Sequence, residues 1–120
     1  MREQSSQQIP QEVQLKFADE HIVPILNGEK TMTLRVGLDS TDFKQARPIS
    51  FCDTDGALFA EAAVEDRGYT TVEMAANMHL EGHRNYDGTD ELLEELKSYY
   101  PDNDIDANTR VDIIRWGELW

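Results

Sequence analysis

Residues 28–35, GEKTMTLR, bring amine, hydroxyl and guanidinium side chains together in one short segment. A threonine hydroxyl such as that of Thr33 becomes a useful nucleophile only when a base removes its proton. Lys30 can be that base if burial or a neighbouring cation lowers its pKa. Arg35 can bind a carbonyl oxygen or a phosphate. The segment therefore predicts either acyl transfer or the binding of a ligand that carries such oxygens.

The residue types of this segment favour a β-strand over residues 30–36. Successive side chains of a strand point to opposite faces of the sheet. Thr31, Thr33 and Arg35 then share one polar face, while Met32 and Leu34 share the face that enters the core. Alternatively, the threonines are simply good strand formers and the arginine pairs with a surface carboxylate.

Lys30 is the exception to this alternation, because its position has the parity of the core face. It can approach Thr33 only if the chain bends before the strand begins. Gly28 permits such a bend, since glycine adopts backbone conformations that other residues avoid. The catalytic interpretation therefore depends on a turn after Gly28.

A second polar cluster is HLEGHRNY, which runs from His79 to Tyr86. His79 and His83 are four residues apart, but Gly82 lies between them and the order is not HExxH. A zinc site also requires further ligands, so we predict no metal site. His83 and Arg84 are instead candidates to contact a phosphate or stack on a base, or they are ordinary surface residues.

The first half of the chain predicts a strand, a helix and a second strand. Val13, Leu15 and Phe17 alternate with polar residues, as in a half-buried strand. A short helix follows from a possible cap at Asp19, with a late start or kink at Pro24. Asn27-Gly28 is a typical helix stop, after which the strand at 30–36 begins.

The second half predicts a hairpin, two helices and a closing strand. The hairpin pairs residues 48–54 with 58–66 around a polar turn. Thr70 to Glu73 has capping-box spacing, which predicts a helix to about Met78. The remaining elements are a helix that Thr89 can cap and Pro101 stops, with Asp90 and Glu91 in its first turn and Lys97 in its last, and a strand over residues 109–116.

The predicted order is β-α-β-β-β-α-α-β, with mostly short connections. This order indicates an α+β fold built on a small, mostly antiparallel β-barrel with flanking helices. A barrel would also remove exposed sheet edges. We expect a flexible tail over residues 1–10, which are polar, and a single domain over residues 11–120.

The chain carries 24 acidic and 11 basic residues, for a net charge of −13. Because 39% of the residues are hydrophobic and occur in patterned blocks, the acidic groups are expected on a folded surface. Such a surface suits a halophilic cytoplasm, where salt screens the repulsion, or an ordinary acidic mesophilic protein. It argues against a broad basic face for DNA.

Cys52 is the single cysteine, which excludes an internal disulfide and a cysteine-rich zinc site. No apolar run has the length of a membrane span, and no signal peptide is recognisable. We expect a soluble cytoplasmic protein without a membrane partner and without a cofactor. The oligomeric state is not predicted.

Over residues 13–116 the order of elements and motifs resembles the ASCH domain family, which is similar to PUA domains. The family signature is a Gly-x-Lys-(x)-Thr-x-Arg stretch after the first helix, here Gly28, Lys30, Thr33 and Arg35. An acidic residue, often followed by glycine, precedes a later helix in this family. In this sequence it is Glu81 in Glu81-Gly82.

The resemblance implies a small barrel with a cleft for RNA or a nucleoside-like ligand. Some members of the family are amidohydrolases that remove the acetyl group of N4-acetylcytidine with a lysine, a threonine and a glutamate. Carried over by position, the catalytic residues are Lys30, Thr33 and Glu81. The predicted ligand-binding residues are Gly28, Thr31, Arg35, His83 and Arg84.

Three functions remain open from the sequence. The cleft can hydrolyse an amide, bind RNA or a nucleoside without turnover, or be a vestige in a regulatory interaction domain. A tight salt bridge between Lys30 and Glu81 would keep the lysine charged and would weaken the enzymatic interpretation. Whether Lys30, Thr33 and Glu81 converge in one pocket is the deciding observation.

Overall fold

The computed structural model describes residues 13–38 and 47–120, so the tail predicted at 1–10 lies outside the described residues. Its elements follow the predicted order β-α-β-β-β-α-α-β. They are β1 (Val13–Lys16), the 3-10 helix η2 (Asp19–His21), α1 (Ile22–Leu26), β2 (Met32–Arg35), β3 (Pro48–Cys52), β4 (Leu58–Thr71), α2 (Val72–Ala76), α3 (Thr89–Tyr99) and β5 (Arg110–Trp116).

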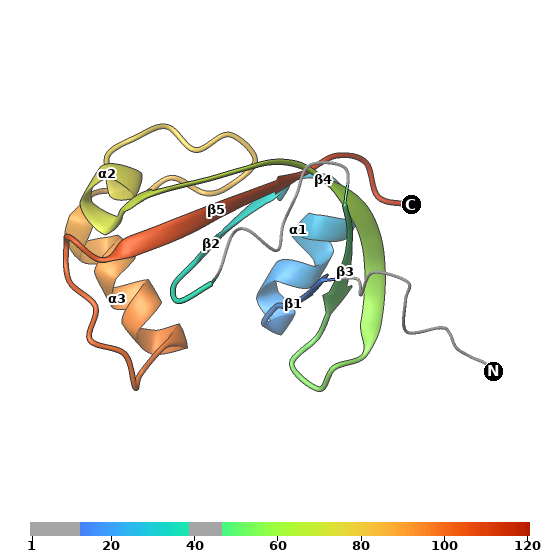
Figure 1. Cartoon of the computed structure of the whole chain (residues 1–120), viewed down its shortest axis with the longest axis horizontal. Helices are drawn as coiled ribbons and strands as arrows, with labels where there is room; N and C mark the ends of the chain where they lie inside the picture. The colour runs from blue at the N-terminus through green and yellow to red at the C-terminus, as the bar shows by residue number, and fades with distance from the viewer. Residues whose placement is uncertain (1–12, 39–46) are drawn as a thin grey trace.

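The five strands form one curled sheet in the order β1-β3-β4-β5-β2 (Figure 1). The pairs β3–β4, β4–β5 and β2–β5 are antiparallel, whereas β1–β3 is parallel. The α+β class is therefore confirmed, and the sheet is mixed. The predicted barrel is confirmed only in part, because the strands form a half-barrel in which β1 and β2 do not pair along the described chain.

The connection between β1 and β3 explains the parallel pair. It includes η2, α1 and β2, and parallel strands require a long crossover of this kind. This crossover carries β2 to the far edge of the sheet, where it pairs with β5. The segment with the candidate site thus lies at one edge, and β1 lies at the other.

The long strand β4 joins the two ends of the sheet. Its first part pairs with β3, and its second part pairs with β5 after an irregularity between Val64 and Asp66. Bulges of this kind bend a strand and increase its twist. The bend lets one strand serve two lobes, one near α1 and one near α3 (Figure 1).

Each lobe has its own hydrophobic core. One cluster packs β2 and β5 against α2 and α3, and it includes Met32, Leu34 and Leu92. The other packs β1, β3 and α1, and it includes Phe51 and Trp116. The predicted core faces are therefore buried as expected at Leu15, Phe17, Met32 and Leu34, and Cys52 is buried as well.

The helix starts differ from the prediction by about one residue. The side chain that caps α2 is that of Thr71, which accepts from the amide of Met74, rather than that of Thr70. Asp19 caps no helix, because the chain enters through the 3-10 turn of η2. The late start at Ile22 leaves Pro24 in the first turn of α1, where a missing N–H is tolerated.

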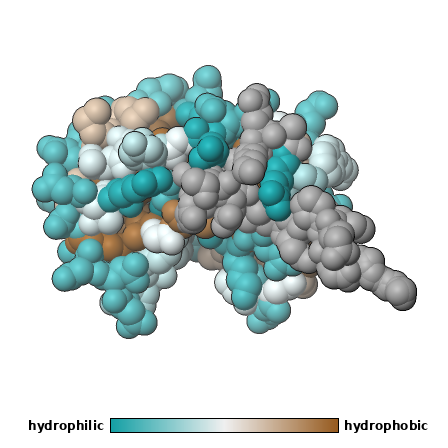
Figure 2. Space-filling view, in the orientation of Figure 1, coloured by the Kyte–Doolittle hydropathy of each residue, from teal (hydrophilic) through white to brown (hydrophobic). Residues whose placement is uncertain are grey.

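Hydrophilic side chains cover much of the face seen in Figure 2, in keeping with the acidic composition. Among the described residues, no helix is both long enough and apolar enough to span a membrane.

Trp116 is the first residue to test in this fold, because it is 2% exposed and its ring lies 4.8 Å from that of Phe51. We expect Trp116→Ala to lower the free energy of unfolding by about 3–5 kcal/mol, since it removes a large side chain from a packed core. Urea unfolding measures this loss. Trp120→Ala is the matched control, because Trp120 is 69% exposed, and a comparable loss there would contradict the assignment.

Candidate functional site

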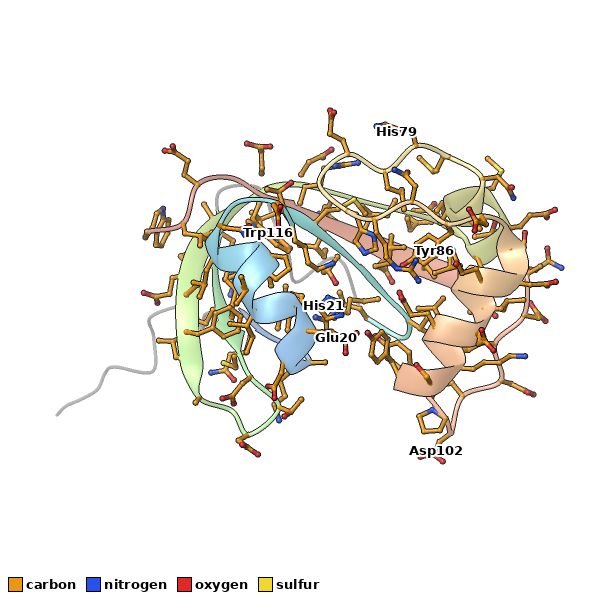
Figure 3. All side chains as sticks on the ribbon, turned by 180° about the vertical axis from the view of Figure 1, so that it is seen from behind. Glu20, His21, His79, Tyr86, Asp102 and Trp116 are labelled. Atoms are coloured by element: carbon orange, nitrogen blue, oxygen red, sulfur yellow. The ribbon has the colours of Figure 1, made fainter. Side chains whose placement is uncertain are left out.

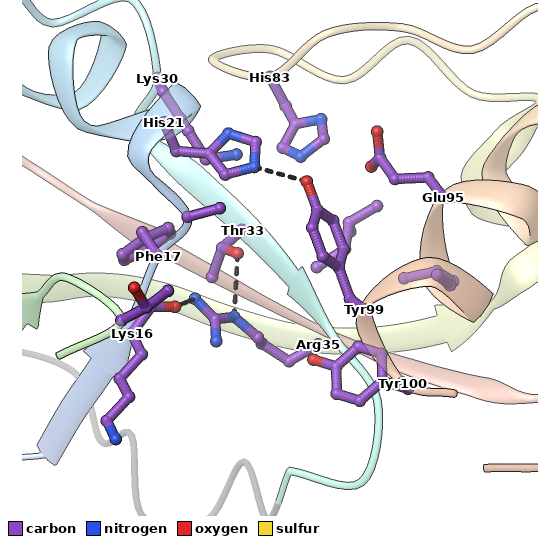
Figure 4. Close-up of a pocket in the computed structure, with 14 residues that line it drawn as sticks. Lys16, Phe17, His21, Lys30, Thr33, Arg35, His83, Glu95, Tyr99 and Tyr100 are labelled. Atoms are coloured by element: carbon purple, nitrogen blue, oxygen red, sulfur yellow. Dashed lines mark hydrogen bonds between the residues drawn. The ribbon is translucent and has the colours of Figure 1, made fainter. Parts of the chain in front are cut away.

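A cavity of about 240 Å³ lies between the two lobes (Figure 4). Its lining comes from β1, η2, the segment before β2, β2 itself, the turn between β3 and β4, the loop before α3, and α3. The lining residues are Lys16, Phe17, Ala18, His21, Lys30, Thr33, Leu34, Arg35, Thr54, His83, Glu95, Leu96, Tyr99 and Tyr100.

Strand β2 presents Thr33 and Arg35 to this cavity, as alternation predicted. The predicted bend is also present. Gly28 has φ +87°, in the region that favours glycine, and the amide of Lys30 donates to the carbonyl of Pro24 at 3.0 Å. The bend turns Lys30 inward, so Lys30 and Thr33 line the same cavity despite their opposite parity.

Arg35 spans the gap between the two edge strands. Its Nε donates to Thr33 Oγ1 at 3.1 Å, and its Nη2 donates to the carbonyl of Lys16 in β1 at 2.7 Å. The guanidinium also lies 4.6 Å from the centre of the Phe17 ring. One side chain thus connects the nucleophile candidate to the opposite edge of the half-barrel (Figure 4).

The Lys30 side chain is buried at the wall of the cavity. Lys30 is 8% exposed, and no side-chain hydrogen bond or ion pair engages it within residues 13–38 and 47–120. Burial, followed by the positive charge of Arg35, lowers its pKa from 10.5 to about 8. Roughly a tenth of the amine is therefore neutral at pH 7. The salt bridge that would have kept Lys30 charged is not formed with any described residue.

His83 enters the cavity as a neutral ring. Burial, followed by the charge of Lys30, lowers its pKa to about 4. Its Nδ1 lies 2.9 Å from the carbonyl oxygen of Arg84, and because a carbonyl only accepts, Nδ1 carries the proton. Nε2 of His83 is then a hydrogen-bond acceptor available to a ligand.

His21 and Tyr99 meet across the cavity from opposite lobes. His21 Nε2 and the Tyr99 hydroxyl share a hydrogen bond of 2.9 Å (Figure 4). Burial is the main cause that lowers the pKa of His21, and the charge of Lys30 adds to it. This contact joins η2 to α3 and narrows the opening.

The carboxylate of the cavity belongs to Glu95 on α3. It accepts from Arg84 at 2.8 Å and from the hydroxyl of Tyr86, and the Arg84 guanidinium lies 4.3 Å from the centre of the Tyr86 ring. Burial alone would raise the pKa of Glu95, but these hydrogen bonds lower it below the ordinary value. Glu95 is thus an ionised group whose position is set by Arg84 and Tyr86.

A second compartment, of about 360 Å³, shares part of this lining and extends outward. The shared residues are His21, Lys30, His83 and Glu95. The outer walls add Glu20, Pro24, Glu29 and Arg84. The amine of Lys30 therefore stands at the junction of the two compartments.

Glu81, which the resemblance placed in the catalytic set, is exposed and lines neither compartment. Its carbonyl accepts from Arg115 at 3.0 Å. Thr31 also lines neither compartment, and its amide donates to the carbonyl of Gly82 at 2.8 Å. A Cβ at Gly82 would overlap the Thr31 side chain, so this close approach requires glycine there.

His79 points outward from the loop after α2, far from His21 in the view of Figure 3. No cluster of three His, Cys, Asp or Glu side chains suited to a metal ion occurs in the described part of the chain. Of the predicted site residues, the cavity thus brings together Lys30, Thr33, Arg35 and His83, with Arg84 at its outer wall.

Sequence reasoning missed Glu95, His21 and the polar role of Tyr99. Tyr99 stood at the end of the helix predicted between Thr89 and Pro101, and Glu95 was one of many acidic residues. No local signal distinguishes Glu95, because its partner Arg84 lies 11 residues away and meets it only after the loop folds back. The one hint that the sequence offered was that Arg84 is a basic residue in the loop before this helix.

No family model and no curated protein match this sequence. Solved structures do match: crystal structures of the ASCH protein of Zymomonas mobilis, one wild type and two mutants. Their TM-scores are 0.57, 0.60 and 0.64 at 12–13% identity, over 89–91% of this chain and 67–69% of theirs. At this identity the likeness concerns the fold alone, and it confirms that the chain has an ASCH-like fold.

The buried charge of Lys30 predicts a pH-dependent stability. Below pH 8 the lysine is protonated in both states, so folding bears the full cost of burying the charge. Between pH 8 and 10.5 only the unfolded state keeps the proton, so stability rises with pH, and above 10.5 the cost is gone.

We therefore expect Lys30→Met to raise the free energy of unfolding at pH 7 by up to about 3 kcal/mol, with the gain shrinking towards pH 10.5. Urea unfolding of both proteins across this range measures the difference. Lys16→Met is the control at an exposed lysine of the same lobe. A gain for Lys30→Met that does not change with pH would show that the ammonium is not the cause.

Proposed function

With the ASCH-like domain fold as premise, we propose that this protein hydrolyses the exocyclic amide of a modified nucleoside, of the N4-acetylcytidine type. The proposed nucleophile is Thr33 and the proposed base is Lys30. One observation carries the proposal: a buried lysine of lowered pKa, whose amine has no partner among the described residues, shares a cavity with a hydroxyl that already accepts a hydrogen bond from Arg35.

Activation of Thr33 follows from its hydrogen bond with Arg35. Because Arg35 Nε donates to Thr33 Oγ1, the oxygen is an acceptor in that bond and its own proton remains free to be donated. The neutral amine of Lys30 takes this proton while the oxygen attacks the amide carbonyl. The nearby guanidinium favours the negative charge that develops.

The same proton then completes the first half of the reaction. The Lys30 ammonium returns it to the leaving nitrogen, so the nucleoside departs as a neutral amine and the acetyl group stays on Thr33 as an ester. Water hydrolyses this ester, with the Lys30 amine again accepting a proton. A pKa near 8 suits both directions of transfer.

Glu95 takes the place of the carboxylate that the resemblance assigned to Glu81. Its negative charge raises the pKa of Lys30 against burial and against Arg35, so it favours the ammonium that forms during the first step. Arg84 and Tyr86 hold the carboxylate, which prevents a tight ion pair with the lysine. The proposed role is therefore electrostatic and not that of a proton donor.

The charges at the opening favour a free nucleoside over an RNA strand. The outer walls carry Glu20 and Glu29, and Arg84 is engaged by Glu95 at 2.8 Å and by Glu91 at 3.5 Å. Phosphates would meet carboxylates there, whereas nucleic-acid affinity depends on free cations. The connected compartments, of about 240 and 360 Å³, reach the size range of small-molecule sites, roughly 300–1,000 Å³.

We expect Thr33→Ala to reduce turnover of N4-acetylcytidine by a factor of at least about 10³, because the acyl acceptor is lost. Binding should persist, since the alanine leaves the rest of the lining intact. Release of acetate measures turnover, and calorimetry measures binding. Thr31→Ser is the matched control on the same segment and should keep full activity. Binding without turnover by the wild type would replace the proposal by a non-catalytic nucleoside module.

The assignment of the carboxylate is tested by Glu95→Gln against Glu81→Gln. We expect the first to lower kcat about tenfold or more, because the ammonium of Lys30 loses its stabilising charge, and the second to have little effect. For the wild type, kcat/KM should rise with pH and level off above about 8, as Lys30 loses its proton. A larger loss of kcat in Glu81→Gln than in Glu95→Gln would assign this role to Glu81 instead.

A further inference from the structure

The buried positive charge that lines the cavity exceeds the negative charge of the carboxylates that line it. Lys30 and Arg35 both line it, and neither has a carboxylate within ion-pair distance among the described residues. Glu95, the acidic residue of the inner lining, is already paired with Arg84 at 2.8 Å. Because buried charges are ordinarily paired, this imbalance points to an anionic group on a ligand.

The Lys30 amine has the environment of a nucleophilic lysine. Such lysines are desolvated or stand beside another cation, so that the neutral form is accessible, and they react with carbonyl carbon to form imines. Lys30 meets both conditions, because it is 8% exposed and is close enough to Arg35 for that charge to act on it. No described side chain donates a hydrogen bond to the lone pair of its neutral amine.

We propose that Lys30 captures small aldehydes or ketones as imines, and that Arg35 favours those that carry a carboxylate. The site would thus bind a small oxo acid covalently and reversibly. This activity uses the lysine of the proposed hydrolase with a different electrophile, and it needs neither Thr33 nor an amide.

The reaction balances without a further reagent. The lysine nitrogen attacks the carbonyl carbon, a proton moves from nitrogen to oxygen, and the carbinolamine loses water to give the C=N bond. No group is oxidised or reduced, and water reverses the reaction. The inner compartment, of about 240 Å³, has room for a compound of two or three carbons beside Lys30.

Borohydride trapping on the native protein tests the proposal. The protein is incubated with glyoxylate at pH 7, the imine is reduced to a stable secondary amine, and the labelled lysines are mapped by mass spectrometry. We expect Lys30 to be labelled at least about tenfold more than exposed Lys16 and Lys97, because burial lowers the pKa of Lys30 from 10.5 to about 8 and leaves part of its amine neutral at pH 7. Equal labelling of the three would overturn the proposal.

Acetaldehyde, used in parallel, tests the preference for a carboxylate. The two aldehydes differ in intrinsic reactivity, so the measured quantity is the ratio of label on Lys30 to label on Lys97, which lines neither compartment, within each sample. We expect this ratio to be several-fold higher with glyoxylate, since Arg35 attracts the carboxylate. An equal ratio for both aldehydes would show that Arg35 does not select the ligand.

Three variants separate this proposal from the hydrolase. Lys30→Arg keeps the charge and should lose the label, while Lys97→Arg, at an exposed lysine outside both compartments, should keep it at Lys30. Thr33→Ala should retain full labelling although it lacks hydrolysis, so either activity can fail without the other. Circular dichroism establishes that each variant is folded, and a label that persists elsewhere at full yield in Lys30→Arg would contradict the assignment.

Discussion

The half-barrel and its cavity depend on the contacts that the guanidinium of Arg35 makes. The sheet does not close through backbone pairing, because β1 and β2 lie at its opposite edges. Arg35 spans this gap from β2 to the carbonyl of Lys16, stacks on Phe17 and still donates to Thr33. An open sheet leaves a space between two cores, and one side chain both bridges that space and supplies its chemistry.

Charge burial in this space has a thermodynamic consequence. Lys30 is desolvated beside Arg35 and has no partner in the described structure, so its protonated form opposes folding. Such local costs are common where a site needs a reactive group, and the two hydrophobic cores offset this one. Glu95 moderates the cost without cancelling it, because Arg84 and Tyr86 hold its carboxylate.

A close approach between Gly82 and Thr31 helps to position the loop between α2 and α3. Gly82, at φ +77°, lets the backbone meet Thr31, and the residues that follow then direct His83 into the cavity and Arg84 towards α3. The loop thereby links the strand that bears the nucleophile candidate to the helix that bears Glu95. A histidine and a carboxylate from distant segments become neighbours of one amine.

The sequence by itself determined the α+β order of elements, the two faces of β2 and the bend at Gly28, because these depend on side-chain alternation and local backbone preference. It also identified the segment that carries Lys30 and Thr33. Only the tertiary structure decided that the barrel stays open, and that Glu95 enters the cavity while Glu81 faces solvent. The physical reason is that these outcomes depend on contacts between segments far apart in the sequence. Many of the carboxylates are alike in their local sequence, and only burial and charge pairing in the folded protein distinguish them.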